Sequence, residues 1–162
     1  MAERVPPDGS GRTGEARALA LKLLAARRRT EHELAGRLRQ KGFSGEIIEE
    51  TVGFLKEYGL LDDLAYARGW VESRRGKNGV LRMKRDLLAR GIDPVIAGQV
   101  LDQVDEEAQF RAALALVEKR LSRSGGTCPL PRLLRFLKSR GFSDAVTGRV
   151  ARAVSGPGEV CP

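Results

Sequence analysis

The sequence predicts an all-α fold in which three tandem three-helix repeats form an elongated array, straight or curved. The first observation is a tripeptide of a basic residue, a glycine and a large apolar residue that recurs at offsets of 49 and 50 residues: Lys41-Gly42-Phe43, Arg90-Gly91-Ile92 and Arg140-Gly141-Phe142. The second is that apolar residues four positions apart precede each tripeptide, which is the spacing of one helix face. The third is that no short window alternates apolar and polar residues as a half-buried strand does.

Each repeat is expected to begin with a helix, over residues 16–26, 62–75 and 106–121. The first of these helices ends near a run of three arginines. Thr30, with Glu33 three residues later, then forms a capping box that begins the next helix. Gly59 ends the third helix of the first repeat, and Asp62 or Asp63 caps the fourth helix, where a negative charge meets the positive end of the helix dipole.

The middle helix of each repeat carries a matched apolar pair: Leu34/Leu38, Met83/Leu87 and Leu133/Leu137. We expect each middle helix to end at the glycine of its tripeptide, where a left-handed backbone is cheapest without a Cβ. The third helices follow Ser44, Asp93 and Ser143, whose side-chain oxygens can accept free N–H groups of the first turn.

These elements divide the chain into a disordered N-terminal tail over 1–15, repeats over 16–61, 62–104 and 105–155, and a disordered C-terminal tail over 156–162. Residues 124–131, rich in Gly and Pro, form the plainest loop and the expected internal hinge. A unit of this length is marginal alone, so stacking on its neighbours is expected to stabilise it.

Basic residues outnumber acidic ones by 29 to 21, which gives a net charge of +8. A surplus of this size indicates a polyanionic or acidic partner, although an Arg-rich genome would produce the same bias. Residues 105–155 hold ten basic and five acidic residues, so the surplus is concentrated in the third repeat. Cys128 and Cys161 lack metal or disulfide spacing, and no signal peptide or membrane-spanning stretch is visible. We therefore expect a cytoplasmic protein with no membrane partner.

The residue patterns give no support for catalysis. His32 is the only histidine and has no companion for general-base or metal chemistry. Asp62 and Asp63 are neighbours at a helix start, where adjacent side chains do not face each other. The run Gly76-Lys77-Asn78-Gly79 lacks the spacing of a phosphate-binding loop and is typical of a turn between helices. We expect no cofactor, no metal and no enzymatic activity, and therefore a protein that acts by binding.

The repeat register locates candidate binding residues. Arg82 aligns with Arg132 and Arg85 with Arg135, so the middle helices of the second and third repeats carry a matched basic pair away from their apolar stripe. Lys138 and Arg152 add to this basic face. A face that is merely solvated would show the same pattern. Lys41, Arg90 and Arg140 are explained by the helix dipole alone. The five phenylalanines, Phe136 included, fall mostly at core positions.

The run Leu60-Leu61-Asp62-Asp63-Leu64-Ala65-Tyr66-Ala67, followed by Gly79-Val80-Leu81-Arg82 and Leu87-Leu88-Ala89-Arg90-Gly91-Ile92, resembles the RecX family. The resemblance covers about residues 16–154 and is weaker in the third repeat. It implies a non-enzymatic regulator that binds the RecA recombinase filament on DNA in its helical groove and inhibits its ATPase, strand exchange and co-protease activities. It implies no cofactor, and no family motif assigns contact residues.

Two other functions fit the residues. The short connections at Gly42 and Gly141 and the net charge would suit a stand-alone helix-turn-helix-like protein that binds duplex DNA. An α-helical adaptor for another acidic protein is the third candidate. In each case we expect the chain to be a monomer.

Overall fold

The computed structural model describes residues 9–126 and 128–156, and over these residues it contains nine α-helices and no strand. The helices are α1 (Gly9–Ala26), α2 (Glu31–Gln40), α3 (Gly45–Glu57), α4 (Asp63–Arg74), α5 (Val80–Ala89), α6 (Pro94–Leu101), α7 (Glu106–Arg123), α8 (Leu130–Ser139) and α9 (Asp144–Ser155). The predicted all-α class is confirmed.

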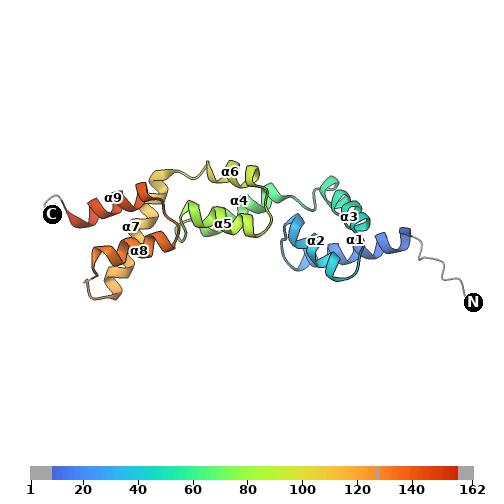
Figure 1. Cartoon of the computed structure of the whole chain (residues 1–162), viewed down its shortest axis with the longest axis horizontal. Helices are drawn as coiled ribbons and strands as arrows, with labels where there is room; N and C mark the ends of the chain where they lie inside the picture. The colour runs from blue at the N-terminus through green and yellow to red at the C-terminus, as the bar shows by residue number, and fades with distance from the viewer. Residues whose placement is uncertain (1–8, 127, 157–162) are drawn as a thin grey trace, which may run out of the picture.

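The helices form three groups in a row, which Figure 1 shows as an elongated body. We call them the first module (α1–α3), the second module (α4–α6) and the third module (α7–α9). In each module the first helix packs on the third. Each module has its own buried cluster, around Leu34, Leu38 and Leu55 in the first, Met83, Leu87 and Ile92 in the second, and Leu133, Leu137 and Phe142 in the third. The apolar pairs predicted for the middle helices therefore lie in the module cores.

The three middle helices end in the same way. Gly42, Gly91 and Gly141 have φ angles of 84°, 77° and 83°. The N–H of the following residue donates to the carbonyl of a core leucine five residues earlier, as in the bond from Phe142 to Leu137 at 3.2 Å. This left-handed ending satisfies carbonyls that the helix itself leaves free. The prediction that these glycines terminate the helices is confirmed.

The predicted N-caps are also confirmed. Ser44 accepts from the N–H of Ile47 at 3.5 Å, Asp93 from that of Val95 at 2.8 Å, and Ser143 from that of Val146 at 3.2 Å. Asp62 rather than Asp63 caps α4, by accepting from the Ala65 N–H at 2.9 Å.

The helix α1 begins at Gly9, seven residues before Ala16, so the prediction of a disordered tail over 1–15 is wrong for residues 9–15. Tertiary contacts explain the difference. Thr13 is buried and donates to a Glu50 carboxylate oxygen at 3.3 Å, and the Arg12 guanidinium lies 5.6 Å from the centre of the Phe43 ring. Local sequence gives no sign of these contacts with α3 and with the turn after α2. Residues 1–8 and 157–162 lie outside the described part of the chain.

The connection between α7 and α8 contains two left-handed glycines, Gly125 at φ 69° and Gly126 at φ 84°. It is shorter than the loop predicted over 124–131, because α8 already begins at Leu130. Pro131 then falls in the first turn, where the missing N–H costs no helical hydrogen bond.

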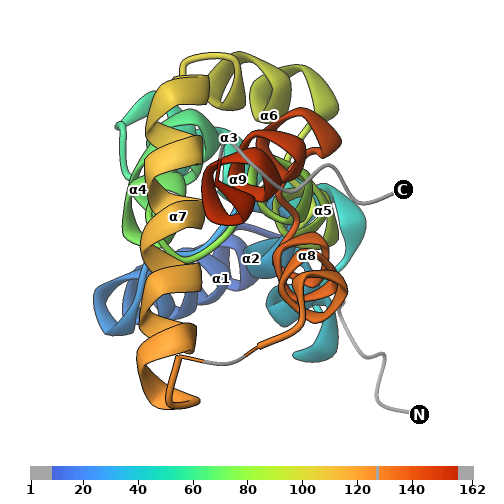
Figure 2. The same cartoon turned by 90° about the vertical axis from the view of Figure 1, so that its left-hand side faces the viewer.

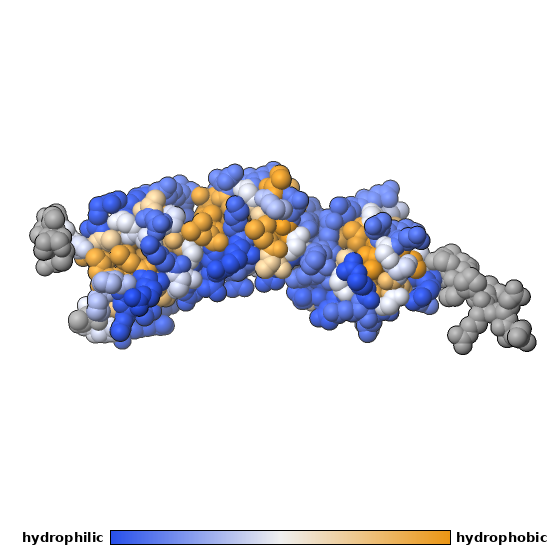
Figure 3. Space-filling model, viewed as in Figure 1, coloured by the Kyte–Doolittle hydropathy of each residue, from blue (hydrophilic) through white to orange (hydrophobic). Residues whose placement is uncertain are grey.

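The surface is mostly hydrophilic, with separate apolar areas over the modules (Figure 3). The most exposed large apolar side chains, Val95 at 77% and Tyr58 at 66%, belong to different modules. Among the described helices none is long and apolar enough to cross a membrane.

Candidate partner and nucleic-acid interface

The first and second modules are joined through the start of α2. Thr30, which is fully buried, donates from its Oγ1 to the Arg90 carbonyl at 2.7 Å and accepts from the Glu33 N–H at 3.1 Å. The Glu33 carboxylate does not complete the predicted capping box, because it lies 3.4 Å from the guanidinium groups of both Arg27 and Arg90. The first-module residue Glu33 is therefore used for an ion pair across the junction.

Asp63 completes this junction. Its Oδ1 accepts from the Glu31 N–H at 2.9 Å, and only 8% of the residue is exposed. Burial raises the pKa of the Asp63 carboxyl above its ordinary value, while the bond from Glu31 and the charge of Lys56 act in the opposite direction. The adjacent aspartates Asp62 and Asp63 thus have separate structural roles.

The second and third modules are joined in the same register, through the start of α5. The Gly79 N–H donates to the Arg140 carbonyl at 2.9 Å, and the Leu81 N–H donates to the Gly141 carbonyl at 3.1 Å. The Val80 N–H donates to Gln109 Oε1 at 3.2 Å, in the place of the bond from Glu31 to Asp63. At each junction, therefore, the start of one module's middle helix is bonded to the end of the next module's middle helix.

The glycines at the junctions have a second role beyond ending a helix. A Cβ added to Gly91 would lie 2.2 Å from His32 Cβ, and one added to Gly141 would lie 2.3 Å from both Cβ and N of Arg82. Gly42 occupies the same position in the first module, and an added Cβ there meets nothing within 4 Å. His32, predicted from the sequence to lie on an exposed turn, lies against Gly91 at this junction.

Arg82, predicted as part of a binding face, lies in the second junction. Its backbone packs on Gly141, its Nη1 donates to the Ser139 carbonyl at 3.3 Å, and its Nε lies 3.9 Å from Asp86. Lys138 is also engaged, because its Nζ lies 2.9 Å from Asp144. Both residues therefore make contacts within the chain that register alone did not show.

The other four predicted residues are exposed and form no ion pair with a described acid: Arg85, Arg132, Arg135 and Arg152. Arg85 lies on α5, Arg132 and Arg135 lie on α8, and Arg152 lies on α9. No described hydrogen bond or ion pair joins these four side chains. The structure therefore presents separate cations along the array rather than one compact site.

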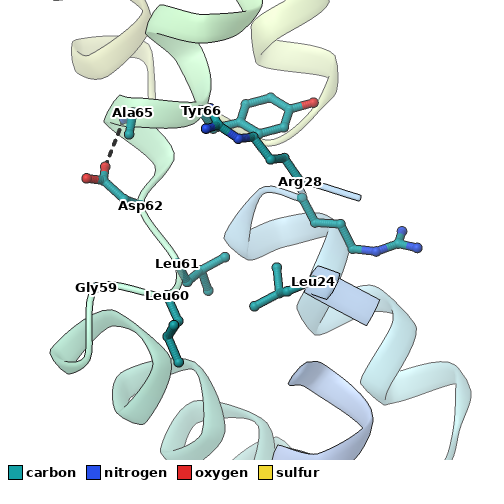
Figure 4. A pocket seen from close by; sticks show the side chains of 9 residues that line it. Leu24, Arg28, Gly59, Leu60, Leu61, Asp62, Ala65 and Tyr66 are labelled. Atoms are coloured by element: carbon teal, nitrogen blue, oxygen red, sulfur yellow. Dashed lines mark hydrogen bonds between the residues drawn. The ribbon is translucent and has the colours of Figure 1, made fainter. Parts of the chain in front are cut away.

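The leucine and aspartate run borders a small pocket between the end of α1 and the start of α4, with a volume of about 250 Å³ (Figure 4). Leu24 and Leu61 face each other across it, and Asp62 turns toward the Ala65 N–H rather than toward Arg28. The run therefore caps α4 and links two modules. Over residues 9–126 and 128–156, no three His, Cys, Asp or Glu side chains are grouped to hold a metal ion.

Sequence reasoning did not bring together one basic cluster in the third module. Lys119, Arg120 and Arg123 at the end of α7 line one pocket with Phe136 of α8 and with Arg140, the residue that follows α8. The sequence contains one sign of it, since Arg132, Phe136 and Arg140 are spaced four residues apart and share a helix face.

Two family models match the chain: "RecX, first three-helix domain" over residues 16–55 and "RecX, second three-helix domain" over residues 62–101. The regulatory protein RecX of Amycolatopsis mediterranei is 35% identical, over 91% of this chain and 86% of its own length. The chain belongs to the RecX family. The RecX protein of Mycobacterium marinum is 36% identical, over 91% of this chain and 90% of its own. These RecX relatives are named as regulatory proteins.

Solved RecX structures share the fold. The crystal structure of RecX from Lactobacillus salivarius superposes with a TM-score of 0.83 at 22% identity, over 90% of this chain and 98% of that one. A second crystal structure, of a regulatory protein RecX, gives 0.77 at 24% identity, over 88% of this chain and 72% of that one. Membership of the RecX family confirms the resemblance seen in the sequence. Neither of the two family models covers the third module, but the sequence relatives and both structures span 88–91% of this chain and therefore extend into it.

Proposed function

We propose that the chain is a non-enzymatic regulator that binds the RecA recombinase filament on DNA, in its helical groove, and inhibits ATP hydrolysis, strand exchange and co-protease activity. The observation that carries the proposal is the extended row of modules in a chain of the RecX family (Figure 1). A filament groove repeats its surface along one direction, so a rod of similar modules can contact neighbouring subunits in turn. The protein acts as a monomer in the cytoplasm.

The charge distribution supports binding to such a surface. Arg85 on α5 and Arg135 on α8 occupy the same register position in successive modules, and both are exposed without an ion pair to a described acid. Exposed arginines offer planar donor groups to phosphate or carboxylate oxygens. Arg82, in contrast, contributes by holding the second and third modules together.

A titration of DNA-dependent ATPase tests the proposal. The chain is added to its cognate recombinase on single-stranded DNA, and ATP hydrolysis is expected to fall at substoichiometric amounts of the chain. Unchanged hydrolysis at saturating chain would refute the proposed function. Strand exchange and co-protease cleavage, measured in the same titration, test the remaining activities separately.

A charge reversal tests the basic face. The double variant Arg132→Glu/Arg135→Glu is expected to inhibit the ATPase less while keeping its helical circular dichroism, because both side chains are exposed. The matched control is Lys22→Glu/Arg68→Glu, which changes the net charge equally at two exposed positions of the first and second modules. Equal inhibition by the two double variants would show that the basic face is merely solvated.

The alternative, a stand-alone helix-turn-helix-like DNA-binding protein, is less well supported by the charges on the third helix of the first and second modules. A recognition helix enters the major groove between phosphates. α3 instead exposes Glu46, Glu49 and Glu50, and α6 has no charged residue. Tight binding to bare duplex with a steep salt dependence would nevertheless favour this alternative over the filament regulator.

A further inference from the structure

The end of α7 and one face of α8 enclose a pocket of about 430 Å³ in the third module. Its lining contains four cationic side chains, from Lys119, Arg120, Arg123 and Arg140, and no carboxylate. None of the four forms an ion pair with a described acid. Figure 2 shows the two helices: α7 runs past α9, and its C-terminal half lies beside α8.

An aromatic ring holds two of the guanidinium groups in place. Arg120 lies over the Phe136 ring at 4.5 Å from its centre, and Arg140 lies over it at 5.4 Å. A guanidinium stacked on a ring keeps its N–H groups free at its edge, where they can bind a phosphate in bidentate fashion. Because arginines already lie over the ring, Phe136 is not a platform for a nucleic-acid base.

Helix capping does not account for these cations. None of these four side chains donates a hydrogen bond to a described carbonyl, and two of the last carbonyls of α7 have other donors: the Arg120 carbonyl accepts from the Ser124 N–H at 3.2 Å, and the Leu121 carbonyl accepts from the Ser124 hydroxyl at 3.1 Å and the Gly126 N–H at 2.9 Å. Attraction to the helix dipole remains, but it is worth less than about 1 kcal/mol at an exposed site. It does not explain four cations around one pocket.

The second module provides an internal comparison. There Arg74 and Arg90 both lie 5.5 Å from the centre of the Trp70 ring, so an aromatic side chain again contacts two arginines. However, Arg90 is neutralised by Glu33 of the first module at 3.4 Å. At the second junction the residue in the register of Glu33 is Arg82. The first junction therefore supplies an acid to the second module, whereas the second junction supplies a further base to the third module.

The cationic surface extends past the pocket along α8. Arg132, Phe136 and Arg140 are four residues apart, so they lie on one face of the helix. The distance between successive turns is about 5.4 Å. A ligand with several linked phosphates can therefore contact the pocket and Arg132 together, whereas a single small anion would use the pocket alone.

We propose that this pocket binds the phosphate backbone of a single-stranded nucleic acid. A flexible strand can place a phosphate inside a concave site between two helices, which a stiff duplex cannot. The covered Phe136 ring makes the contact independent of base identity. The inference deepens the proposed function, since a filament on DNA would bring a strand to the third module, but its test needs no recombinase.

The test measures binding of the full chain to a fluorescein-labelled oligothymidylate by fluorescence anisotropy over a range of salt concentrations. The variant is Lys119→Gln/Arg120→Gln/Arg123→Gln. Its affinity is expected to fall about tenfold or more, and its slope of log affinity against log salt to become shallower by about 2, at roughly 0.7 per lost phosphate contact with a single strand. Its circular dichroism and melting temperature should be unchanged or higher, because like charges are removed.

The matched control, Lys22→Gln/Arg68→Gln/Arg111→Gln, removes three exposed cations elsewhere; Arg111 lies nine residues from Arg120 and thus on about the opposite side of α7. Affinity and slope near wild type in the control support the pocket. An equal loss in both triple variants, or no loss in the pocket variant, would overturn it. Binding of inorganic tripolyphosphate without binding of the oligonucleotide would overturn the assignment to a strand. If the wild-type chain binds the oligonucleotide through the pocket but does not inhibit the ATPase, only the proposed function is refuted.

Discussion

Replacing Gly141 by alanine tests whether the repeated glycine is needed for the junction as well as for the end of α8. The added Cβ would lie 2.3 Å from Arg82 Cβ and N and 2.8 Å from Arg82 Cα. An ordinary contact begins near 3.4 Å, so the backbone of α5 must move by about 1 Å. The bonds from the Gly79 N–H at 2.9 Å and the Leu81 N–H at 3.1 Å would not survive that shift.

The size of the effect follows from two contributions. An alanine in a left-handed conformation costs about 1–2 kcal/mol. Two lost backbone hydrogen bonds add about 2 kcal/mol, at roughly 1 kcal/mol each. Gly42→Ala is the matched control, because Gly42 has a φ of 84°, against 83° for Gly141, at the same helix position but nothing near an added Cβ. We expect Gly141→Ala to be more destabilising than Gly42→Ala by about 2 kcal/mol.

Urea unfolding followed by circular dichroism measures the difference, and amide hydrogen exchange locates it. In wild type and in Gly42→Ala, the amides of Gly79 and Leu81 should be protected from exchange. In Gly141→Ala these two amides should exchange faster, while the core amides of the first module should not change. Equal destabilisation by the two variants, with Gly79 and Leu81 still protected, would refute the argument that the junction requires glycine.

Two further predictions concern the first junction. Burial raises the pKa of Asp63 in the folded chain, so its negative charge lowers the stability of the fold at neutral pH. This cost is lost as the pH falls through the raised pKa of the folded chain toward the pKa of the unfolded chain, about 3.9. Asp63→Asn, which keeps an acceptor for the Glu31 N–H, should therefore melt at least as high as wild type at pH 7 and lose any advantage in acid; a lower melting temperature at pH 7 would contradict this. Thr30→Val removes both the cap and the bond to the Arg90 carbonyl and should cost about 2 kcal/mol, against about 1 kcal/mol for Ser44→Ala, which removes a cap alone, as measured by urea unfolding.

The elements of the fold could be predicted because their causes are local. Ser44 and Ser143 accept from N–H groups three residues ahead, and Gly42 and Gly91 end helices through bonds to carbonyls a few residues back. All of these partners lie within five residues of each other in the sequence. The start of α1 escaped prediction because Thr13 is held by Glu50, 37 residues away.

The candidate site was predicted less completely. Register placed Arg85, Arg132 and Arg135 on exposed helix faces, as observed. It placed Arg82 with them, although the side chain lies in the junction with the third module. The pocket around Arg120 and Arg140 could not be predicted from either helix alone, because its lining combines residues at the end of α7 with Phe136 and Arg140.

Sequence alone determined the helices, their ends, the repeat and the family, because helix periodicity and capping act over four or five neighbouring residues. Tertiary structure decided which of the repeated residues remain free. Glu33 and Arg82 share a register position, yet one pairs with Arg90 across 57 residues and the other binds the Ser139 carbonyl across another 57. Such partners are chosen by how one module stacks on the next. Which cations of the third module remain without an acidic partner therefore depends on how the modules pack, and cannot be read from any one segment of the sequence.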